Sequence, residues 1–210
     1  MARNDSLYDA IITGNFQAAQ DATNAALEAG TNPSELLNDS MIPAMDEVGR
    51  RFEANEFFVP ELLIAARAMK SALAILSPIL ASSGAVSAGR VVIGTVKGDL
   101  HDIGKNLVAS MLEGGGFEVI DLGVDVSPEQ FVAKAMEKDG TIVCLSALLT
   151  TTMPNMEAVI KALSEAGIRE KTKVMVGGAP IDQAFADRIG ADGYSDNASA
   201  AVALARTLVA

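Results

Sequence analysis

A single histidine lies between two aspartates in the stretch Gly98-Asp99-Leu100-His101-Asp102-Ile103-Gly104. Asp99 precedes His101 by two residues, so its carboxylate can reach one nitrogen of the imidazole ring. Such a hydrogen bond would fix the tautomer of the ring and leave the other nitrogen free to bind a metal. The plainer alternative is that His101 and Asp102 merely begin a helix, with Asp102 as its cap.

The residue types in the chain restrict the kind of metal site that His101 can form. Ordinary metal sites in proteins use three or four protein ligands, and this chain has one histidine and one cysteine, Cys144. The lone cysteine also excludes an internal disulfide and favours a reducing compartment. A metal that a macrocycle already holds needs only an axial ligand from the protein. The composition therefore favours a metallocofactor that brings its own equatorial ligands.

Two further loops carry residue types suited to binding. Ser146-Ala147-Leu148-Leu149-Thr150-Thr151-Thr152 follows an apolar run, and the hydroxyl of Thr152 can hydrogen-bond Asp99 if this loop folds back. Gly177-Gly178 has no side-chain bulk, which lets a ligand approach the backbone closely. Ordinary turn chemistry explains either loop taken alone.

The second part of the chain alternates apolar, β-branched runs with helical patterns. We expect strands at Val91–Val96, Glu118–Leu122, Thr141–Leu145, Lys173–Val176 and Gly193–Ser195. We expect helices at Gly104–Glu113, Pro128–Lys138, Pro154–Ala166, Ile181–Ile189 and Asn197–Val209. This alternation predicts a flavodoxin-like (Rossmann-like), doubly wound α/β domain with a five-stranded parallel sheet in the order 2-1-3-4-5. Ligands of such sheets bind beyond the carboxyl ends of the strands, where the three loops fall.

The first 82 residues have helical periodicity and predict a four-helix bundle. Asn32 is expected to cap a helix, with Glu35 completing a capping box, and Pro43 to kink or restart that helix. Residues 82–89 are small and uncharged and form the best linker in the chain. We therefore predict a helical cap domain at 1–84 and a ligand-binding domain at 90–210.

The composition and the net charge limit the kinds of partner that the chain can bind. The chain has 210 residues, half of them apolar, and a formal net charge of −11 with no basic run. These values favour a folded protein and argue against nucleic acid or an anionic membrane as a partner. The N-terminus lacks the apolar core of a signal peptide, and no uncharged apolar run approaches the length of a membrane span. The sequence predicts a cytoplasmic protein.

The spacing of the three loops resembles a known signature. Asp-x-His-x-x-Gly, Ser-x-Leu and Gly-Gly follow one another at gaps of forty-one and twenty-eight residues. This pattern resembles the cobalamin-binding signature of corrinoid proteins, and GTVKGDLHDIGKN is similar to the cobalamin domain of methionine synthase and of the corrinoid subunits of methyltransferase systems. The upstream string MIPAMDEVGRRFEANEFFVPELLIAARAMK resembles the helical cap domain of the same proteins. The resemblance covers nearly the whole chain.

The resemblance implies roles for individual residues. It makes Nε2 of His101 the lower axial ligand of cobalt, with Asp99 orienting the ring and Thr152 standing where the family's relay usually has a serine. It places Phe52 and Val59 over the upper face of the cofactor, although ordinary bundle core also explains these two. The remaining positions implied to contact cobalamin are Gly98, Leu100, Asp102, Gly104, Ser146, Leu148, Thr150, Gly177 and Gly178.

By the same resemblance the chain is a methyl carrier, with methylcobalamin formed in turnover, and not an enzyme acting alone. One methyltransferase would load it from a methylamine, glycine betaine, methanol or a methoxylated aromatic. A second would unload it to tetrahydrofolate or coenzyme M, and a reductive activator is a further implied partner. Three alternatives stay open: the cobalamin-binding subunit of an adenosylcobalamin mutase, a cobalamin-dependent regulator, and a flavodoxin-like domain without a corrin. The regulator would need a DNA-binding module, which the sequence does not display.

Overall fold

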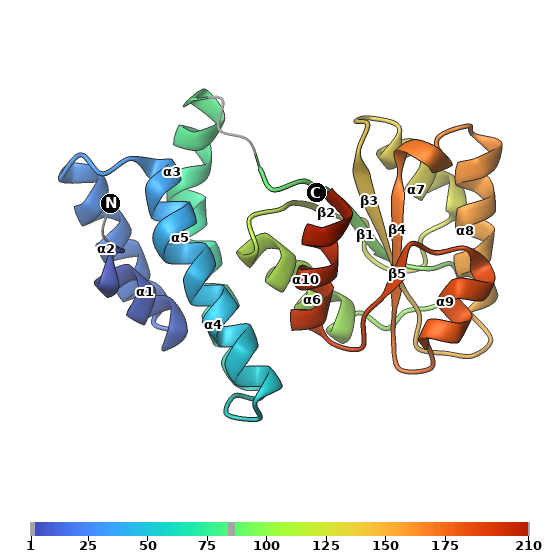
Figure 1. The fold of residues 1–210 in the computed structure, drawn as a ribbon, viewed down its shortest axis with the longest axis horizontal. Helices are drawn as coiled ribbons and strands as arrows, with labels where there is room; N and C mark the ends of the chain where they lie inside the picture. Colours follow the sequence, from blue (N-terminus) through green and yellow to red (C-terminus); the bar gives the residue numbers. More distant parts are fainter. Residues whose placement is uncertain (1–2, 84–86, 210) are drawn as a thin grey trace. The chain divides into compact units, whose positions relative to one another are not determined.

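The computed structural model describes residues 3–83 and 87–209, which fall into two compact units (Figure 1). The helical unit comprises the chain up to Ser87 together with 110–116, and the α/β unit comprises 88–109 and 117–210. Residues 84–86 of the expected linker lie outside the described residues. The domain boundaries at 84 and 90 stay a prediction.

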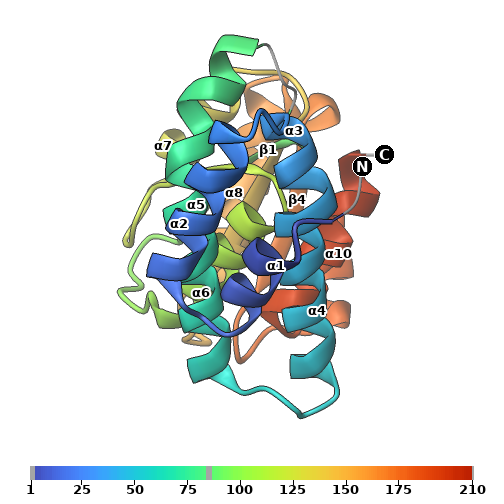
Figure 2. The same cartoon turned by 90° about the vertical axis from the view of Figure 1, so that its left-hand side faces the viewer.

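Residues 3–83 of the helical unit form four helical rods, as the periodicity predicts (Figure 2). One of them is composite, because a short helix, a π-helical turn and a longer helix follow one another without a break. The elements are α1 (Asp5–Ile12), α2 (Phe16–Glu28), α3 (Pro33–Leu36), the π turn (Leu37–Met41), α4 (Ile42–Glu53) and α5 (Val59–Ser83).

The composite rod shows how the chain accommodates Pro43. A proline inside a helix removes one N–H donor and collides with the preceding turn. Here the preceding turn is π-helical, the N–H of Ile42 bonds the carbonyl of Leu37, and Pro43 lies in the first turn of α4. Asn32 caps α3 as expected by accepting from the N–H of Ser34 at 2.8 Å. The predicted return bond is wrong, because the N–H of Asn32 makes no hydrogen bond to Glu35 among the described residues, and Oε2 of Glu35 is buried without a partner there.

The helix α5 is long and apolar enough to cross a membrane when judged by length and composition alone. Its buried positions nevertheless form one stripe within the bundle, which is the pattern of the central helix of a helical core. The buried residues of this helix are Leu62, Ala65, Ala66, Ala68, Met69, Ala72, Leu76 and Leu80.

The α/β unit is a five-stranded parallel sheet in the order β2-β1-β3-β4-β5, which confirms the predicted topology. Helices cover both faces; α7, α8 and α9 lie on one and α10 on the other (Figure 1). The strands are β1 (Arg90–Thr95), β2 (Glu118–Asp121), β3 (Thr141–Ser146), β4 (Lys173–Gly177) and β5 (Gly193–Tyr194). The helices are α6 (Ile103–Gly114), α7 (Pro128–Ala135), α8 (Pro154–Glu165), α9 (Gln183–Ile189) and α10 (Ala198–Val209), with a 3-10 turn at Arg169–Lys171.

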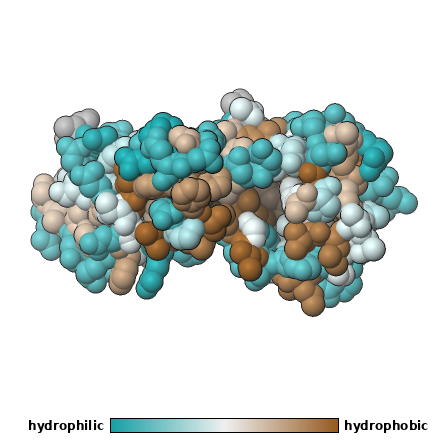
Figure 3. Space-filling model, turned by 90° about the horizontal axis from the view of Figure 1, so that it is seen from below, coloured by the Kyte–Doolittle hydropathy of each residue, from teal (hydrophilic) through white to brown (hydrophobic). Residues whose placement is uncertain are grey.

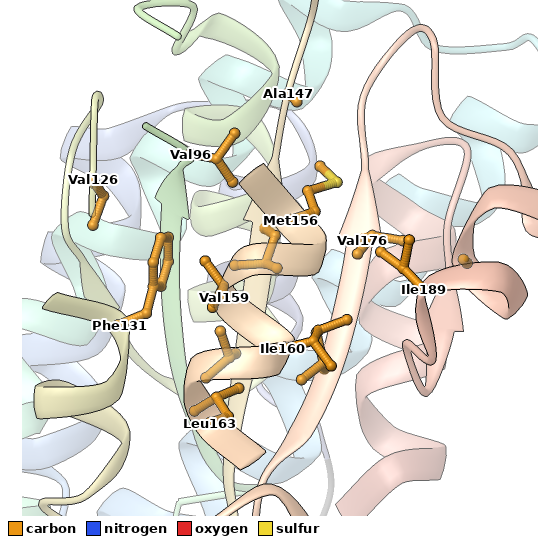
Figure 4. Packing of buried hydrophobic residues seen from close by; sticks show 14 of the residues in the cluster. Val96, Val126, Phe131, Ala147, Met156, Val159, Ile160, Leu163, Val176 and Ile189 are labelled. Atoms are coloured by element: carbon orange, nitrogen blue, oxygen red, sulfur yellow. The ribbon is translucent and has the colours of Figure 1, made fainter. Parts of the chain in front are cut away.

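The main core of this unit lies between the sheet and the helices α7, α8 and α9 (Figure 4). Every residue of β1 is buried, as expected for a central parallel strand. Gly94 is needed there, because a Cβ would stand 2.8 Å from the ring of Phe131. A capping box of Ser127 and Gln130 forms at the start of α7.

The strand register brings three loops to one edge of the sheet. Thr95 at the end of β1 pairs with Ser146 at the end of β3, and Ser146 pairs with Gly177 at the end of β4. The β1–α6, β3–α8 and β4–α9 loops therefore all begin at the same edge, which is where the candidate site is found.

Candidate functional site

The carboxylate of Asp99 is fully buried at this edge and is held by the β3–α8 loop. Its Oδ2 accepts hydrogen bonds from the N–H of Leu148 at 2.8 Å, the hydroxyl of Thr152 at 2.7 Å and the N–H of Leu149 at 3.3 Å. The loop after β3 thus folds back onto the loop after β1. The hydrogen bond expected between Thr152 and Asp99 is formed.

The other oxygen of Asp99 holds His101. Oδ1 lies 2.7 Å from Nδ1 of the imidazole and accepts from the backbone N–H of His101 at 3.1 Å. Thr95 donates to the carbonyl of His101 at 2.8 Å, so the backbone of this residue is held as well. A carboxylate can only accept, so Nδ1 carries the proton and the lone pair is on Nε2. The side chain of His101 is 51% exposed, which leaves Nε2 able to bind a ligand.

The environment of Asp99 keeps it ionised. Burial opposes ionisation and by itself would raise the pKa of this carboxyl. The hydrogen bonds from Leu148, Thr152 and His101 favour the carboxylate and together outweigh burial, so the pKa lies well below its ordinary value. Asp99 is therefore a permanent acceptor at neutral pH and holds the imidazole in one tautomer.

Large apolar side chains are exposed next to this histidine. Leu100 and Ile103 flank His101 in the chain and are 71% and 79% exposed. Leu148 and Leu149, whose backbone N–H groups hold Asp99, are exposed too. Figure 3 shows hydrophobic patches among polar surface on the α/β unit. An exposed imidazole among exposed aliphatic side chains suits a ligand that is largely apolar around a metal.

The glycines at this edge of the sheet differ in whether the packing of the protein requires a residue without a side chain. A Cβ on Gly104, in the first turn of α6, would meet nothing within 4 Å, so internal packing does not require a glycine there. Gly178 has φ +135°, and a Cβ on it would collide with the carbonyl oxygen of Ala147. Close approach of two loops therefore explains Gly178, and a Cβ on Gly177 would likewise stand 3.2 Å from the carbonyl of Ser195. A ligand contact at this pair stays a prediction.

The other predicted positions on the α/β unit lie at the same edge with different exposure. Ser146 is half-buried at the end of β3, and its hydroxyl has no partner among the residues that the structure describes. Thr150 is exposed. Asp102 is exposed immediately before α6 and accepts from the side-chain amide of Asn106 at 3.1 Å. His101 and Asp102 thus do precede a helix, which is compatible with a ligand-binding role for His101.

The two expected cap residues belong to the helical unit. Phe52 is half-buried in the last turns of α4, and Val59 is exposed at the start of α5. They stand on either side of the α4–α5 connection. Their contact with a cofactor stays a prediction.

The structure adds two polar residues that the sequence reasoning missed. Asp125, in the β2–α7 loop, accepts from the N–H of Gly98 at 2.8 Å and donates its own N–H to the carbonyl of Asp99 at 3.0 Å. Lys105 is buried at the start of α6 and donates to Asp121 at the end of β2 at 2.5 Å. Both Asp121 and Asp125 follow the core of β2 closely, and β2 lies next to β1 in the sheet. The predicted strand order was therefore a signal that these residues lie near the loop after β1.

Within residues 3–83 and 87–209, no group of three or more His, Cys, Asp or Glu side chains could hold a metal ion. His101 would therefore act as a single protein ligand. The imidazole of His101 has Nδ1 fixed by a hydrogen bond and Nε2 free, and its neighbours are apolar. This arrangement fits a metal whose other ligands come from a cofactor.

Comparison with known proteins agrees with this geometry. A family model described as B12 binding domain matches residues 89–203, and a second model of the same description matches residues 3–77. The chain belongs to the B12-binding corrinoid proteins. Its α/β unit and its helical unit thus correspond to the two B12-binding parts of this family.

Several relatives and solved structures match this chain along nearly its whole length. It is 46% identical over 208 residues to dimethylamine corrinoid protein 1 of Methanosarcina acetivorans, covering 97% of this chain and 96% of the relative. It is 47% identical to trimethylamine corrinoid protein 2 of the same organism, covering 92% and 90%. A cobalamin-binding protein from Desulfitobacterium hafniense matches with a TM-score of 0.79 at 32% identity, covering 99% and 98%. A chain of the methanol:cobalamin methyltransferase complex MtaBC from Methanosarcina barkeri matches with a TM-score of 0.86 at 32% identity, covering 98% and 79%.

Proposed function

We propose that this corrinoid protein carries methyl groups between two methyltransferases. A substrate-specific methyltransferase loads it, and a second one transfers the methyl group to tetrahydrofolate or coenzyme M. The observation that carries the proposal is the imidazole of His101, held at Nδ1 by a buried and ionised carboxylate and exposed at Nε2. We also propose that it works in the cytoplasm and requires a reductive activator.

The residues at the sheet edge fit a corrinoid. Nε2 of His101 would be the protein's ligand to the cobalt, and the exposed side chains of Leu100 and Ile103 would offer apolar contact beside it. The unpaired hydroxyl of Ser146 and the backbone of the β3–α8 loop offer polar contacts for a nucleotide tail. Gly104 leaves open space in the first turn of α6, and this supports the close approach of a ligand there. For Phe52 and Val59 of the helical unit we propose contact with the cofactor.

When bound, the corrinoid supplies a cobalt that can take up and release a methyl group. Asp99 keeps the ring of His101 in the tautomer that binds through Nε2 and makes that nitrogen a better donor. Thr152 keeps Oδ2 of Asp99 hydrogen-bonded throughout, and it retains the hydroxyl that serine provides in the family's relay.

The comparisons support the methyltransferase system over the other classes. The relatives matched along nearly their whole length are named dimethylamine and trimethylamine corrinoid proteins, and one structural neighbour belongs to a methanol:cobalamin methyltransferase complex. No described observation favours the mutase or the regulator. Methylamines are accordingly the first donors to test, and methanol the second.

The test combines a spectrum with a transfer assay. Protein reconstituted with hydroxocobalamin is expected to show the spectrum of cobalamin whose own base is replaced by histidine. His101→Ala shifts that spectrum toward unligated cobalt, whereas an exposed control, Asp196→Ala, leaves it unchanged. Loaded protein is then mixed with candidate methyltransferases and labelled methylamines or methanol. An unchanged spectrum in His101→Ala rejects the ligand, and failure to accept a methyl group from every donor rejects the carrier function.

A further inference from the structure

Asp125 has an unusual backbone conformation. Among the described residues, only Asn55 and Asp125 are non-glycine residues with positive φ, and Asp125 has φ +54°. L-residues avoid this left-handed region, and Asp and Asn tolerate it better than most. A non-glycine residue held there is a reason to look for a local purpose.

Asp125 makes three contacts with the loop that carries His101. Its Oδ1 accepts from the N–H of Gly98 at 2.8 Å, and its N–H donates to the carbonyl of Asp99 at 3.0 Å. Its Oδ2 lies 3.1 Å from the ammonium of Lys97. The left-handed conformation is what lets the N–H and the carboxylate of one residue face the same short stretch.

These contacts complete the support of Asp99. The β3–α8 loop holds its side chain through Leu148 and Thr152, and Asp125 holds its backbone from the β2–α7 loop. The ring of His101 is placed by its hydrogen bond to Asp99, so the position of Nε2 depends on both neighbouring loops. An axial ligand must meet its metal within a few tenths of an ångström, which makes such support significant.

We propose that Asp125 is a positioning residue for His101. Its carboxylate fixes the Gly98–Asp99 backbone so that Nε2 stands where the cobalt of a bound corrinoid needs it. The inference rests on the proposed function. The ion pair with Lys97 is exposed on both sides and contributes less than the hydrogen bond to Gly98.

Three substitutions separate the contributions. Asp125→Asn keeps a carbonyl acceptor for the N–H of Gly98 and tolerates the left-handed region, so it should behave like the wild type. Asp125→Gly suits the left-handed region and loses the acceptor. We expect it to fold as stably as the wild type without cobalamin, to bind hydroxocobalamin about tenfold more weakly and to show a spectrum shifted toward unligated cobalt. Asp125→Ala loses the acceptor and strains the backbone, so it should also be less stable without cobalamin.

Two results overturn the role of Asp125. The first is an Asp125→Gly protein whose spectrum and affinity equal those of the wild type. The second comes from the His101→Ala background, where a residue that acts through His101 can have little further effect. If Asp125→Gly still weakens hydroxocobalamin binding tenfold in that background, Asp125 supports the fold of the site and not the ligand. Either result leaves the proposed function intact, because that function fails only if the wild type shows no histidine-ligated cobalamin or carries no methyl group.

Discussion

The substitution Asp99→Asn tests the centre of the site most directly. The carboxylate accepts five hydrogen bonds, two at Oδ1 from His101 and three at Oδ2 from Leu148, Leu149 and Thr152. An asparagine has one acceptor oxygen and one NH2 group, which can only donate. One of the two sets of donors must then face a donor, whichever way the amide is turned.

Each orientation of the amide has its own consequence. If the NH2 faces His101, Nδ1 must accept and the proton moves to Nε2, which cannot then bind a metal. If the NH2 faces the β3–α8 loop, Thr152 can reverse its hydroxyl, but the N–H of Leu148 loses its acceptor. A donor left unpaired in a buried place costs about 1–3 kcal/mol, and the loss of charge adds to this. We therefore expect the free energy of unfolding without cobalamin to fall by about 2–3 kcal/mol.

Urea unfolding and absorption spectra measure the two effects. The m-value should be unchanged if only the native state is affected, and the reconstituted protein should lose the spectrum of histidine-ligated cobalamin. Thr152→Ser is the matched control, because it keeps the hydroxyl that donates to Asp99. An Asp99→Asn protein that unfolds at the same urea concentration and keeps the ligated spectrum would refute the view that the charged carboxylate holds the ring.

Three further predictions follow from single positions. Gly104→Ala should raise the free energy of unfolding without cobalamin by about 0.5–1 kcal/mol, since a methyl group there meets open space in a helix. The same substitution should weaken hydroxocobalamin binding, and an unchanged affinity would show that no ligand lies against Gly104. Gly178→Ala should lower the free energy of unfolding by about 2 kcal/mol or more, with or without cobalamin, because of the φ of +135° and the collision with the carbonyl of Ala147. Calorimetry measures this loss. Hydrogen bonds from Arg50 and Arg51 lower the pKa of Glu47 to about 2, so their stabilisation is complete above about pH 4.3 and is lost as the pH falls toward 2. Urea unfolding should show a free energy of unfolding for Glu47→Gln that is about 1 kcal/mol lower than that of the wild type at neutral pH. The difference should vanish in acid, where Glu47 is protonated.

The sequence predicted the fold in most of its detail. The change from helical periodicity to short apolar runs at Arg90 is strong, and the buried strands β1 and β3 are continuous apolar segments. Strand order followed from the α/β alternation, because handedness leaves few arrangements of five parallel strands. The π turn before Pro43 was not predictable in kind, since a kink, a restart and a widened turn all satisfy a proline in this position.

The site was predicted less completely, and for a physical reason. Asp99, His101 and Thr152 could be brought together because the ends of β1 and β3 meet in the predicted order. The contribution of Asp125 depends on a left-handed backbone at one residue, which no periodicity reveals. The structural reason for Gly178 was equally hidden, because the collision that it avoids is with a loop thirty-one residues earlier.

Thr152 shows how a single hydroxyl helps to keep Asp99 ionised. Its hydroxyl lies 2.7 Å from Oδ2 of Asp99 and 2.9 Å from the carbonyl oxygen of Leu149. A hydroxyl has one proton, so it donates to one of the two at a time. While Asp99 is ionised, the charged acceptor is the stronger and takes the proton. Because the hydroxyl donates to the carboxylate, it acts together with the N–H of Leu148 to stabilise the charge that holds Nδ1 of His101.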